Sequence, residues 1–236
     1  MKIFKKLSCM LIFCIMCLSS NVFANKALNI VFVGECVHVG SGKTELVLAI
    51  IGRRLNYRER IGIYSEDLSF FNKSLKCYLY DTPGASCLQE EIVRKLDNAD
   101  IIVITIDSSD NENEFDGIIK KQLSAINQVY PRLPILLVAT KIDNASEDID
   151  KLYRNFEKLR VAYADTCDFE WVATSAKERI NLGSLTDSED LGNNFWGKIR
   201  YIIKQRNMYD LLREDAGEEN FFNDIRKPRN ESCILV

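Results

Sequence analysis

The sequence predicts a three-layer α/β fold, in which about six strands form a mostly parallel sheet with helices on both faces. Short apolar runs of strand length alternate along the chain with longer segments whose apolar residues recur at helical spacing. The run Ile101–Ile106 consists entirely of β-branched residues, which is typical of a parallel strand buried on both faces. Polar motifs follow several of these runs, and parallel sheets bind ligands beyond the carboxyl ends of their strands. The sequence therefore predicts a ligand site at that edge of the sheet.

The first strand and the first helix flank a loop that contains glycines. Apolar residues at 30–33 predict a buried strand. Leu46 and Ile50 are spaced as on one face of a helix, which is expected to end near Gly52. The basic stretch 53–60 that follows is expected to be a solvated loop.

The remaining elements alternate in type along the chain. Strands at 61–70 and 75–80 are expected to form a hairpin through the turn 71–74. The polar segment 178–192 is expected to be an exposed loop and a candidate partner surface. The other expected elements are, in order, a helix from Ser86 to about Leu96, a strand at 101–106, a helix with the apolar stripe Ile119, Leu123 and Ile126, a strand at 134–139, a helix at 144–164, a strand at 169–174 and a C-terminal helix bearing Phe195, Ile199 and Ile202.

The overall composition narrows the class of protein. The chain has 236 residues, a net charge of −3, 28% charged and 47% hydrophobic residues, which suits one globular domain with tails. It lacks the basic excess that is typical of nucleic-acid-binding proteins. Of the eight cysteines, Cys36, Cys77, Cys87 and Cys167 fall in the expected domain. They lack metal-ligand spacing, which favours packing thiols in a reducing compartment.

The loop after the first strand carries the residues of a phosphate site. Gly34 ends the strand, and Gly40, Gly42, Lys43 and Thr44 lead into the helix. Small residues let backbone N–H groups converge on phosphate oxygens at the positive end of a helix. Lys43 is expected to reach the terminal phosphates, and the Thr44 hydroxyl is expected to bind Mg²⁺.

The spacing of this loop departs from the usual phosphate-loop pattern G-x-x-x-x-G-K-[ST]. Counting back from Lys43 puts Val37 where the first glycine belongs, and Gly34 lies earlier in the chain. Either residues 35–37 are an insertion, or the loop starts without its first glycine. Both alternatives keep a phosphate site between a strand and a helix.

Three further motifs stand at expected strand ends. One strand leads into Asp81-Thr82-Pro83-Gly84, which brings a carboxylate to a glycine turn. Another leads into Thr140-Lys141-Ile142-Asp143, and the last leads into Ser175-Ala176-Lys177. A phosphate loop followed in this order by D-x-x-G, T-K-x-D and S-A-K resembles the Ras superfamily of small GTP-binding proteins. The resemblance covers about Lys26 to Arg213 and implies a P-loop NTPase fold of the small GTPase type.

The resemblance implies a site for GTP or GDP with Mg²⁺ and gives each motif a role. Thr44 and Asp81 would serve Mg²⁺, Asp81 through a water, and the N–H of Gly84 would contact the γ-phosphate. Since that contact exists only with the triphosphate, the segment after Gly84 would be a switch. The nucleotide-binding residues implied by the resemblance are Gly40, Ser41, Gly42, Lys43, Thr44, Glu45, Asp81, Gly84, Thr140, Lys141, Asp143, Ser175, Ala176 and Lys177.

The same resemblance implies specificity for guanine. Asp143 would accept two hydrogen bonds from the guanine ring, while the stem of Lys141 would pack on the face of the ring. Ala176 would donate its backbone N–H to the guanine carbonyl, positioned by Ser175 and Lys177. Adenine lacks the donors that Asp143 requires, so the motifs favour GTP over ATP and disfavour a P-loop ATPase or a small-molecule kinase.

Three residues differ from the family pattern at positions that matter for hydrolysis. Ala85 replaces a glutamine that orients the attacking water, Val39 replaces a glycine, and Arg60 stands where a switch threonine is usual. Phosphoryl transfer depends on a positioned water and on charge neutralisation. We therefore expect a regulatory switch with slow intrinsic GTP hydrolysis, or none. The alternative is a pseudo-GTPase scaffold that binds nucleotide weakly or not at all.

The two ends of the chain carry opposite targeting signals. Residues 1–24 have a basic start, a short apolar run and a small residue at a cleavage position, which is typical of a signal peptide. An uncleaved anchor and a buried first helix are the alternatives. Residues 25–213 form the expected GTPase-like domain, and residues 214–236 form a flexible tail. The tail ends in a C-a-a-X pattern that predicts prenylation of Cys233.

A lipid on Cys233 would place the domain on the cytosolic face of a membrane, whereas a signal peptide directs a protein out of the cytosol. Both signals fit a bacterial protein that is exported into a host cell and imitates a host small GTPase there. Otherwise the leader is an N-terminal anchor or is not a leader. Effectors, exchange factors or activating proteins are expected to bind residues 53–71 and 82–97.

Overall fold

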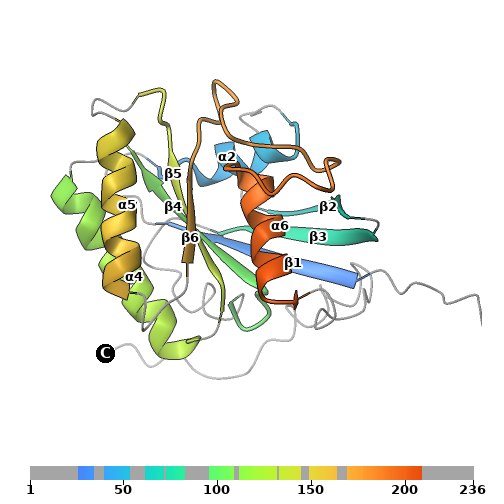
Figure 1. The fold of residues 1–236 in the computed structure, drawn as a ribbon, viewed down its shortest axis with the longest axis horizontal. Coiled ribbons are helices and arrows are strands. Elements are labelled where there is room, and N and C mark those ends of the chain that lie inside the picture. The colour runs from blue at the N-terminus through green and yellow to red at the C-terminus, as the bar shows by residue number, and fades with distance from the viewer. Residues whose placement is uncertain are drawn as a thin grey trace, which may run out of the picture.

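The computed structural model describes much of the expected domain as a single sheet with helices on both faces (Figure 1). The residues described are 26–34, 40–53, 62–71, 73–82, 96–108, 112–131, 133–144, 149–163 and 169–208. The predicted three-layer α/β fold is confirmed. The predicted leader and the whole predicted tail, including Cys233, lie outside the described residues. Within the described part of the chain, no helix combines the length and apolar character needed to cross a bilayer.

The sheet has six strands in the order β2-β3-β1-β4-β5-β6. β2 and β3 are antiparallel, and every other neighbouring pair is parallel. β1 lies between β3 and β4, so its carboxyl end lies near the middle of the edge where the parallel strands end. The bounds are β1 Lys26–Val33, β2 Ile63–Phe70, β3 Lys73–Asp81, β4 Ile101–Asp107, β5 Ile135–Thr140 and β6 Phe169–Ala173.

The two faces of the sheet carry separate hydrophobic cores. α2 (Lys43–Ile50) and α6 (Phe195–Gln205) cover one face, and α4 (Glu112–Val129) and α5 (Ile149–Tyr163) cover the other (Figure 1). Successive side chains of a strand point to opposite faces. Phe32 therefore stacks on Phe195 of α6, with ring centroids 5.9 Å apart, while Val31 joins the core beneath α4 and α5. The expected stripe of Ile119, Leu123 and Ile126 is buried in that second core.

Cys77 of β3 is the expected cysteine that lies among the described residues. It is a free thiol with no exposed surface, packed in the core beneath α2 and α6. Burial raises the pKa of this thiol far above its ordinary value, so it stays protonated. Its predicted role as a packing residue is confirmed.

The hairpin of β2 and β3 is tighter than the sequence predicts. Phe70 pairs with Lys73, so β3 begins two positions before the expected Leu75. The turn is possible because Phe71 adopts a left-handed backbone with φ of 50°. A bulky residue rarely takes this conformation, and sequence patterns therefore favour a longer turn here.

The segment between β6 and α6 is largely exposed, as predicted, but part of its backbone is bound to the edge of the sheet. The N–H of Ser69 donates to the carbonyl of Leu185 over 2.8 Å, and the N–H of Phe71 donates to the carbonyl of Ser188 over 3.2 Å. We call residues 184–188 the edge segment. It lies along the carboxyl-terminal half of β2 and covers polar backbone that would otherwise face solvent.

The edge segment is held by a buried arginine of α6. Arg200 is 0% exposed, and its Nε donates to the carbonyl of Ser69 over 2.9 Å. Its Nη2 donates to the carbonyls of Ser184 and Leu185 over 2.6 and 2.9 Å. Burial lowers the pKa of the guanidinium from a very high starting value. One side chain thus joins α6, β2 and the edge segment.

Candidate functional site

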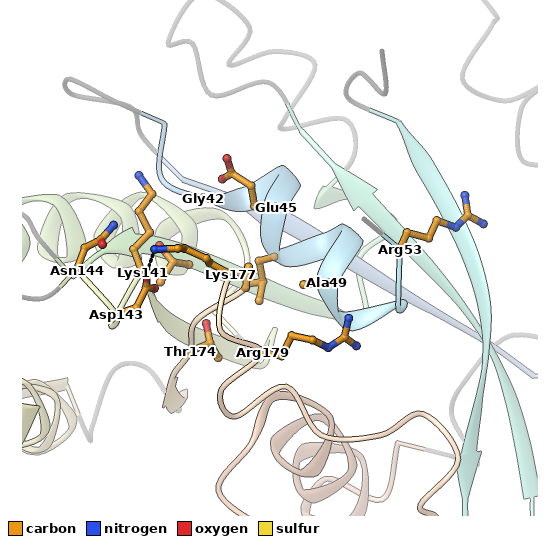
Figure 2. A pocket seen from close by; sticks show the side chains of 13 residues that line it. Gly42, Glu45, Ala49, Arg53, Lys141, Asp143, Asn144, Thr174, Lys177 and Arg179 are labelled. Carbon is orange, nitrogen blue, oxygen red and sulfur yellow. Dashed lines mark ion pairs between the residues drawn. The ribbon is translucent and has the colours of Figure 1, made fainter. Parts of the chain in front are cut away.

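A pocket of about 690 Å³ opens beside the first two turns of α2, at the edge where β5 and β6 end (Figure 2). Most of its lining comes from the motifs found in the sequence. Arg53 and Arg179 lie at the opposite end of the pocket from Asn144 (Figure 2). The lining residues are Gly42, Glu45, Leu46, Ala49, Arg53, Thr140, Lys141, Asp143, Asn144, Thr174, Ala176, Lys177 and Arg179.

The end of β1 and the start of α2 approach each other through Lys43. Its side chain is buried, and Nζ donates to the carbonyl of Gly34 over 3.1 Å. A Cβ on Gly34 would collide with the side chains of Thr105 and Ser41, so this position requires glycine. Gly42 precedes the helix in a left-handed conformation with φ of 73°. The strand-end glycine therefore contacts Lys43 in spite of its longer spacing along the chain.

Thr44 and Asp81 bring two oxygen groups together below this loop. The Thr44 hydroxyl donates to Oδ2 of Asp81 over 2.6 Å, and Asp81 is fully buried at the end of β3. The next residue, Thr82, donates to the carbonyl of Phe32 over 2.5 Å and so fixes the chain after Asp81. A hydroxyl and a carboxylate fit Mg²⁺, which takes one or two protein oxygens together with phosphate and water. Gly84 lies outside the described residues.

Hydroxyl groups tie the phosphate loop to the neighbouring strands. Thr140, at the end of β5, donates to the carbonyl of Ser41 over 2.8 Å. The hydroxyls of Ser41 and Thr105 share a hydrogen bond of 2.9 Å. These buried contacts fix the phosphate loop against the ends of β4 and β5. Breaking them would leave buried polar groups without hydrogen bonds, which is energetically costly.

Lys141 crosses from the end of β5 to the phosphate loop. Its backbone is left-handed, with φ of 57°, and its Nζ donates to the carbonyl of Gly40 over 2.8 Å. The same Nζ forms an ion pair of 2.7 Å with Asp107. Sequence reasoning missed Asp107, although the residue directly follows the apolar run of β4. Its position at a strand end was the available signal.

The carboxylate of Asp143 lines the pocket and is held by two neighbouring side chains. Ser175 donates to Oδ1 over 2.6 Å, and Nζ of Lys177 lies 3.6 Å from Oδ2, as the dashed line in Figure 2 marks. The hydrogen bond from Ser175 is the main cause that lowers the pKa of Asp143, and Lys177 adds to it. The carboxyl group is therefore ionised at neutral pH and fixed in position.

The turn that carries Ser175 is itself held in shape. Ser175 and Ile180 exchange backbone hydrogen bonds of 3.2 and 2.9 Å, and the Ser175 hydroxyl accepts the N–H of Glu178 over 3.0 Å. Asn181 donates its side-chain N–H to the carbonyl of Ala173 over 2.9 Å. This turn places Ala176 and Lys177 on the pocket wall.

The structure thus brings the predicted residues together in two connected groups. The pocket is lined by Gly42, Glu45, Thr140, Lys141, Asp143, Ala176 and Lys177, and Ser175 supports Asp143. Lys43, Thr44 and Asp81 form the second group at the phosphate loop. Sequence reasoning missed Asn144 and Arg179, which are close to motifs in the chain, and Ala49 and Arg53, for which no local signal exists.

The fold and this arrangement define a GTP-binding domain of the P-loop GTPase class. The model of the elongation factor Tu GTP-binding domain family matches residues 52–192, more than half of the chain, and the chain belongs to this family. The matched range begins after the phosphate loop. The phosphate loop is therefore characterised by its contacts in the structure, which involve Gly34, Gly40, Ser41, Lys43 and Thr44.

Two known proteins illustrate the breadth of the similarity. Translation initiation factor IF-2 of Fusobacterium nucleatum is 26% identical over 159 residues, which cover 64% of this chain and 20% of that protein. The Rho-related protein racM of Dictyostelium discoideum is 27% identical over 143 residues, which cover 59% of this chain and 74% of that protein. The chain therefore spans about a fifth of the initiation factor and most of the Rho-related protein.

Proposed function

We propose that this domain is a regulatory switch of the small GTPase type, similar to the Ras superfamily, which binds GTP or GDP with Mg²⁺. The carboxylate of Asp143 carries the proposal, because Ser175 and Lys177 keep it ionised in a pocket that reaches the phosphate loop. A fixed carboxylate accepts the two neighbouring N–H donors of a guanine ring. Adenine has no such pair of donors. Bound adenine would leave the Asp143 carboxylate unpaired, and sites built around such a hydrogen bond strongly reject ligands that cannot form it.

The phosphates would bind at the amino terminus of α2. Lys43 and the backbone N–H groups of residues 40–45 are the donors, and the helix dipole favours negative charge at this end. Thr44 and Asp81 would hold Mg²⁺, which neutralises phosphate charge when bound. The Lys141 stem and the Ala176 backbone complete the proposed base site.

The similarity to the Rho-related protein, which takes in 74% of that protein, supports a switch of the small GTPase type. We propose that effectors bind residues 53–71, which include β2 at the edge of the sheet. Residues 82–97 form the second proposed partner surface, beyond the end of β3.

We further propose that intrinsic hydrolysis of GTP is slow. Ala85, Val39 and Arg60 support this through the loss of residue types that position water and neutralise charge. Single-turnover hydrolysis by the full-length protein tests it against the variant Ala85→Gln. We expect the variant to hydrolyse GTP at least about tenfold faster, as a step limited by water positioning requires. A wild-type rate equal to that of an ordinary small GTPase would contradict the proposal.

The same three residues favour a second candidate, a pseudo-GTPase scaffold that binds nucleotide weakly or not at all. The two candidates differ in the nucleotide that purifies with the full-length protein and in its affinity for fluorescent GDP over fluorescent ADP. Bound GDP or a GDP/GTP mixture supports the switch, together with a preference for GDP over ADP that Asp143→Asn removes. GTP alone indicates a switch locked in the GTP-bound state. Protein that purifies without nucleotide and binds neither analogue supports the scaffold.

We propose that the switch acts at a membrane through a lipid on Cys233, after export from a bacterium into a host cell. The basic, short leader and the C-a-a-X ending support this. One lipid anchors only marginally, so the basic residues 226–229 would assist. Fractionation of host cells that contain tagged wild-type or Cys233→Ser protein tests the proposal. Membrane association that survives this substitution contradicts a lipid anchor and favours the N-terminal anchor.

A further inference from the structure

The ammonium group of Lys141 has two neighbours that belong to different parts of the site. Nζ lies 2.7 Å from Oδ2 of Asp107, at the end of β4, and 2.8 Å from the carbonyl of Gly40, in the phosphate loop. Asp107 is well buried, with a side chain that is 9% exposed, whereas that of Lys141 is 24% exposed. A buried carboxylate therefore fixes the end of a side chain whose stem lines the pocket.

The position of Asp107 follows from the sheet. β4 and β5 are parallel and in a register that pairs Asp107 with Thr140, the residue before Lys141. The left-handed backbone of Lys141 then turns the chain toward the pocket. A Cβ built on Gly42 would lie 3.6 Å from Cε of Lys141, so the stem runs close to the phosphate loop. Asp107, Lys141 and Gly40 thus form one chain of contacts from β4 to that loop.

We infer that Asp107 is a positioning residue, which holds Lys141 in place for the nucleotide and couples the base site to the phosphate loop. This inference rests on the proposed function for its effect on nucleotide. Without the carboxylate, the ammonium loses a charge-assisted hydrogen bond, and its long stem regains rotational freedom. The stem would then no longer be fixed beneath the base, and the Gly40 end of the loop would lose its support.

The test is the rate at which fluorescent GDP leaves the full-length protein. Asp107→Ala is expected to speed release by about tenfold or more, as the loss of a hydrogen bond to a charged group predicts. Asp107→Asn keeps an oxygen acceptor and is expected to have a smaller effect. In the background of Lys141→Met, which has no ammonium, Asp107→Ala is expected to change release by less than about twofold, since the residue acts through Lys141.

A matched control lies at the start of β6, away from the pocket. Glu170 and Lys198 form an ion pair of the same length, 2.7 Å, with side chains that are 23% and 21% exposed. Glu170→Ala removes a comparable pair and is expected to leave GDP release unchanged. Equal release from Asp107→Ala and Glu170→Ala would overturn the inference, as would an effect of Asp107→Ala that persists without the ammonium of Lys141.

A second measurement needs no nucleotide and separates this inference from the proposed function. Acetic anhydride is applied to the nucleotide-free protein, and acetylation of Lys141 is followed by mass spectrometry. We expect faster labelling of Lys141 in Asp107→Ala and Asp107→Asn, but not in Glu170→Ala. Protein that binds no GDP contradicts the proposed function, while the labelling still decides whether Asp107 positions Lys141. Labelling of Lys141 that is unchanged in both Asp107 variants overturns the inference.

Discussion

The hydroxyl of Thr44 donates to the carboxylate of Asp81 over 2.6 Å, which joins the first turn of α2 to the end of β3. The two residues are far apart in the sequence and come from different motifs. Their contact places two hard oxygen ligands side by side next to the buried Lys43. Nucleotide binding in this domain is therefore expected to depend on Mg²⁺ through this pair.

Substitution Thr44→Ala tests that dependence. In the wild type, chelation of Mg²⁺ by EDTA is expected to speed the release of fluorescent GDP by about tenfold or more, because the ion bridges protein and phosphate. In Thr44→Ala, release is expected to be fast already, so that EDTA adds little. Thr186→Ala, an exposed residue of the edge segment, serves as the control. A full response of Thr44→Ala to EDTA would show that the hydroxyl plays no part in metal binding.

Asp143 and Ser175 predict a pH dependence of base recognition. The folded-state pKa of Asp143 lies below its ordinary value of 3.8, so its contribution is present above that pH and is lost as the pH falls through the lowered value. The contribution of Asp143 to GDP affinity is therefore expected to stay constant from neutral pH down to about pH 5.

Ser175→Ala removes the main cause of the lowered pKa. We expect GDP affinity at neutral pH to fall by about fivefold, and the acid loss of binding to begin at a higher pH than in the wild type. Fluorescence titration across pH provides the measurement, with Ser184→Ala as a remote serine control. An unchanged pH profile in Ser175→Ala would mean that the serine does not set the state of Asp143.

Gly34 and Gly117 form a matched pair of glycine substitutions. A Cβ on Gly34 would meet the side chains of Ser41 and Thr105, whereas a Cβ on Gly117, in helix α4, would meet nothing within 4 Å. We expect Gly34→Ala to lower both stability and GDP affinity, because the phosphate loop must shift. Gly117→Ala is expected to raise stability by about 0.5–1 kcal/mol through helix propensity. Urea unfolding and GDP titration of both variants check this pair, and normal GDP binding by Gly34→Ala would contradict it.

Arg200 predicts a large effect on stability from one buried side chain. Arg200→Met would remove the guanidinium donor from the carbonyls of Ser69, Ser184 and Leu185, of which Leu185 keeps the N–H of Ser69, at a cost on the order of 3 kcal/mol in unfolding free energy. Arg200→Lys keeps the charge but cannot reproduce the fork of donors, so it is expected to recover only part of the loss. Urea unfolding measures the unfolding free energy of both variants. A loss below about 0.5 kcal/mol in Arg200→Met would show that these hydrogen bonds contribute little to stability.

Local patterns were sufficient to predict most of the fold. β4 and β5 are continuous apolar runs, and the spacing of Ile119, Leu123 and Ile126 predicts the buried face of α4. These signals are local, because burial on both faces of a strand or on one face of a helix imposes a short period. The tight turn at Phe71 was missed because its left-handed backbone runs against the preference of a bulky residue.

The site was predicted motif by motif, but its internal contacts were not. Asp107 needs the register of β4 against β5 before Lys141 can be recognised as its partner. Arg200 is charged, and charged residues are rarely buried, so a sequence places it on the surface. The edge segment likewise shows no apolar pattern: its backbone hydrogen-bonds to β2, and Leu185 is its one residue that packs against the core.

The backbone between Ser175 and Arg200 runs from the wall of the pocket to the far edge of the sheet and returns into α6. The N–H groups of Phe195 and Trp196 donate to the carbonyls of Asn181 and Leu182, which follow the turn that supports Asp143. Because Arg200 also holds the edge segment, opening α6 would release this turn and the edge of β2 in the same event. Amide protons of Ser69, Phe71 and Ile180 are then expected to exchange with solvent at one common free energy of opening. This part of the domain would behave as a single cooperative unit of local unfolding, so that an occupied base site slows amide exchange at the edge where partners are proposed to bind.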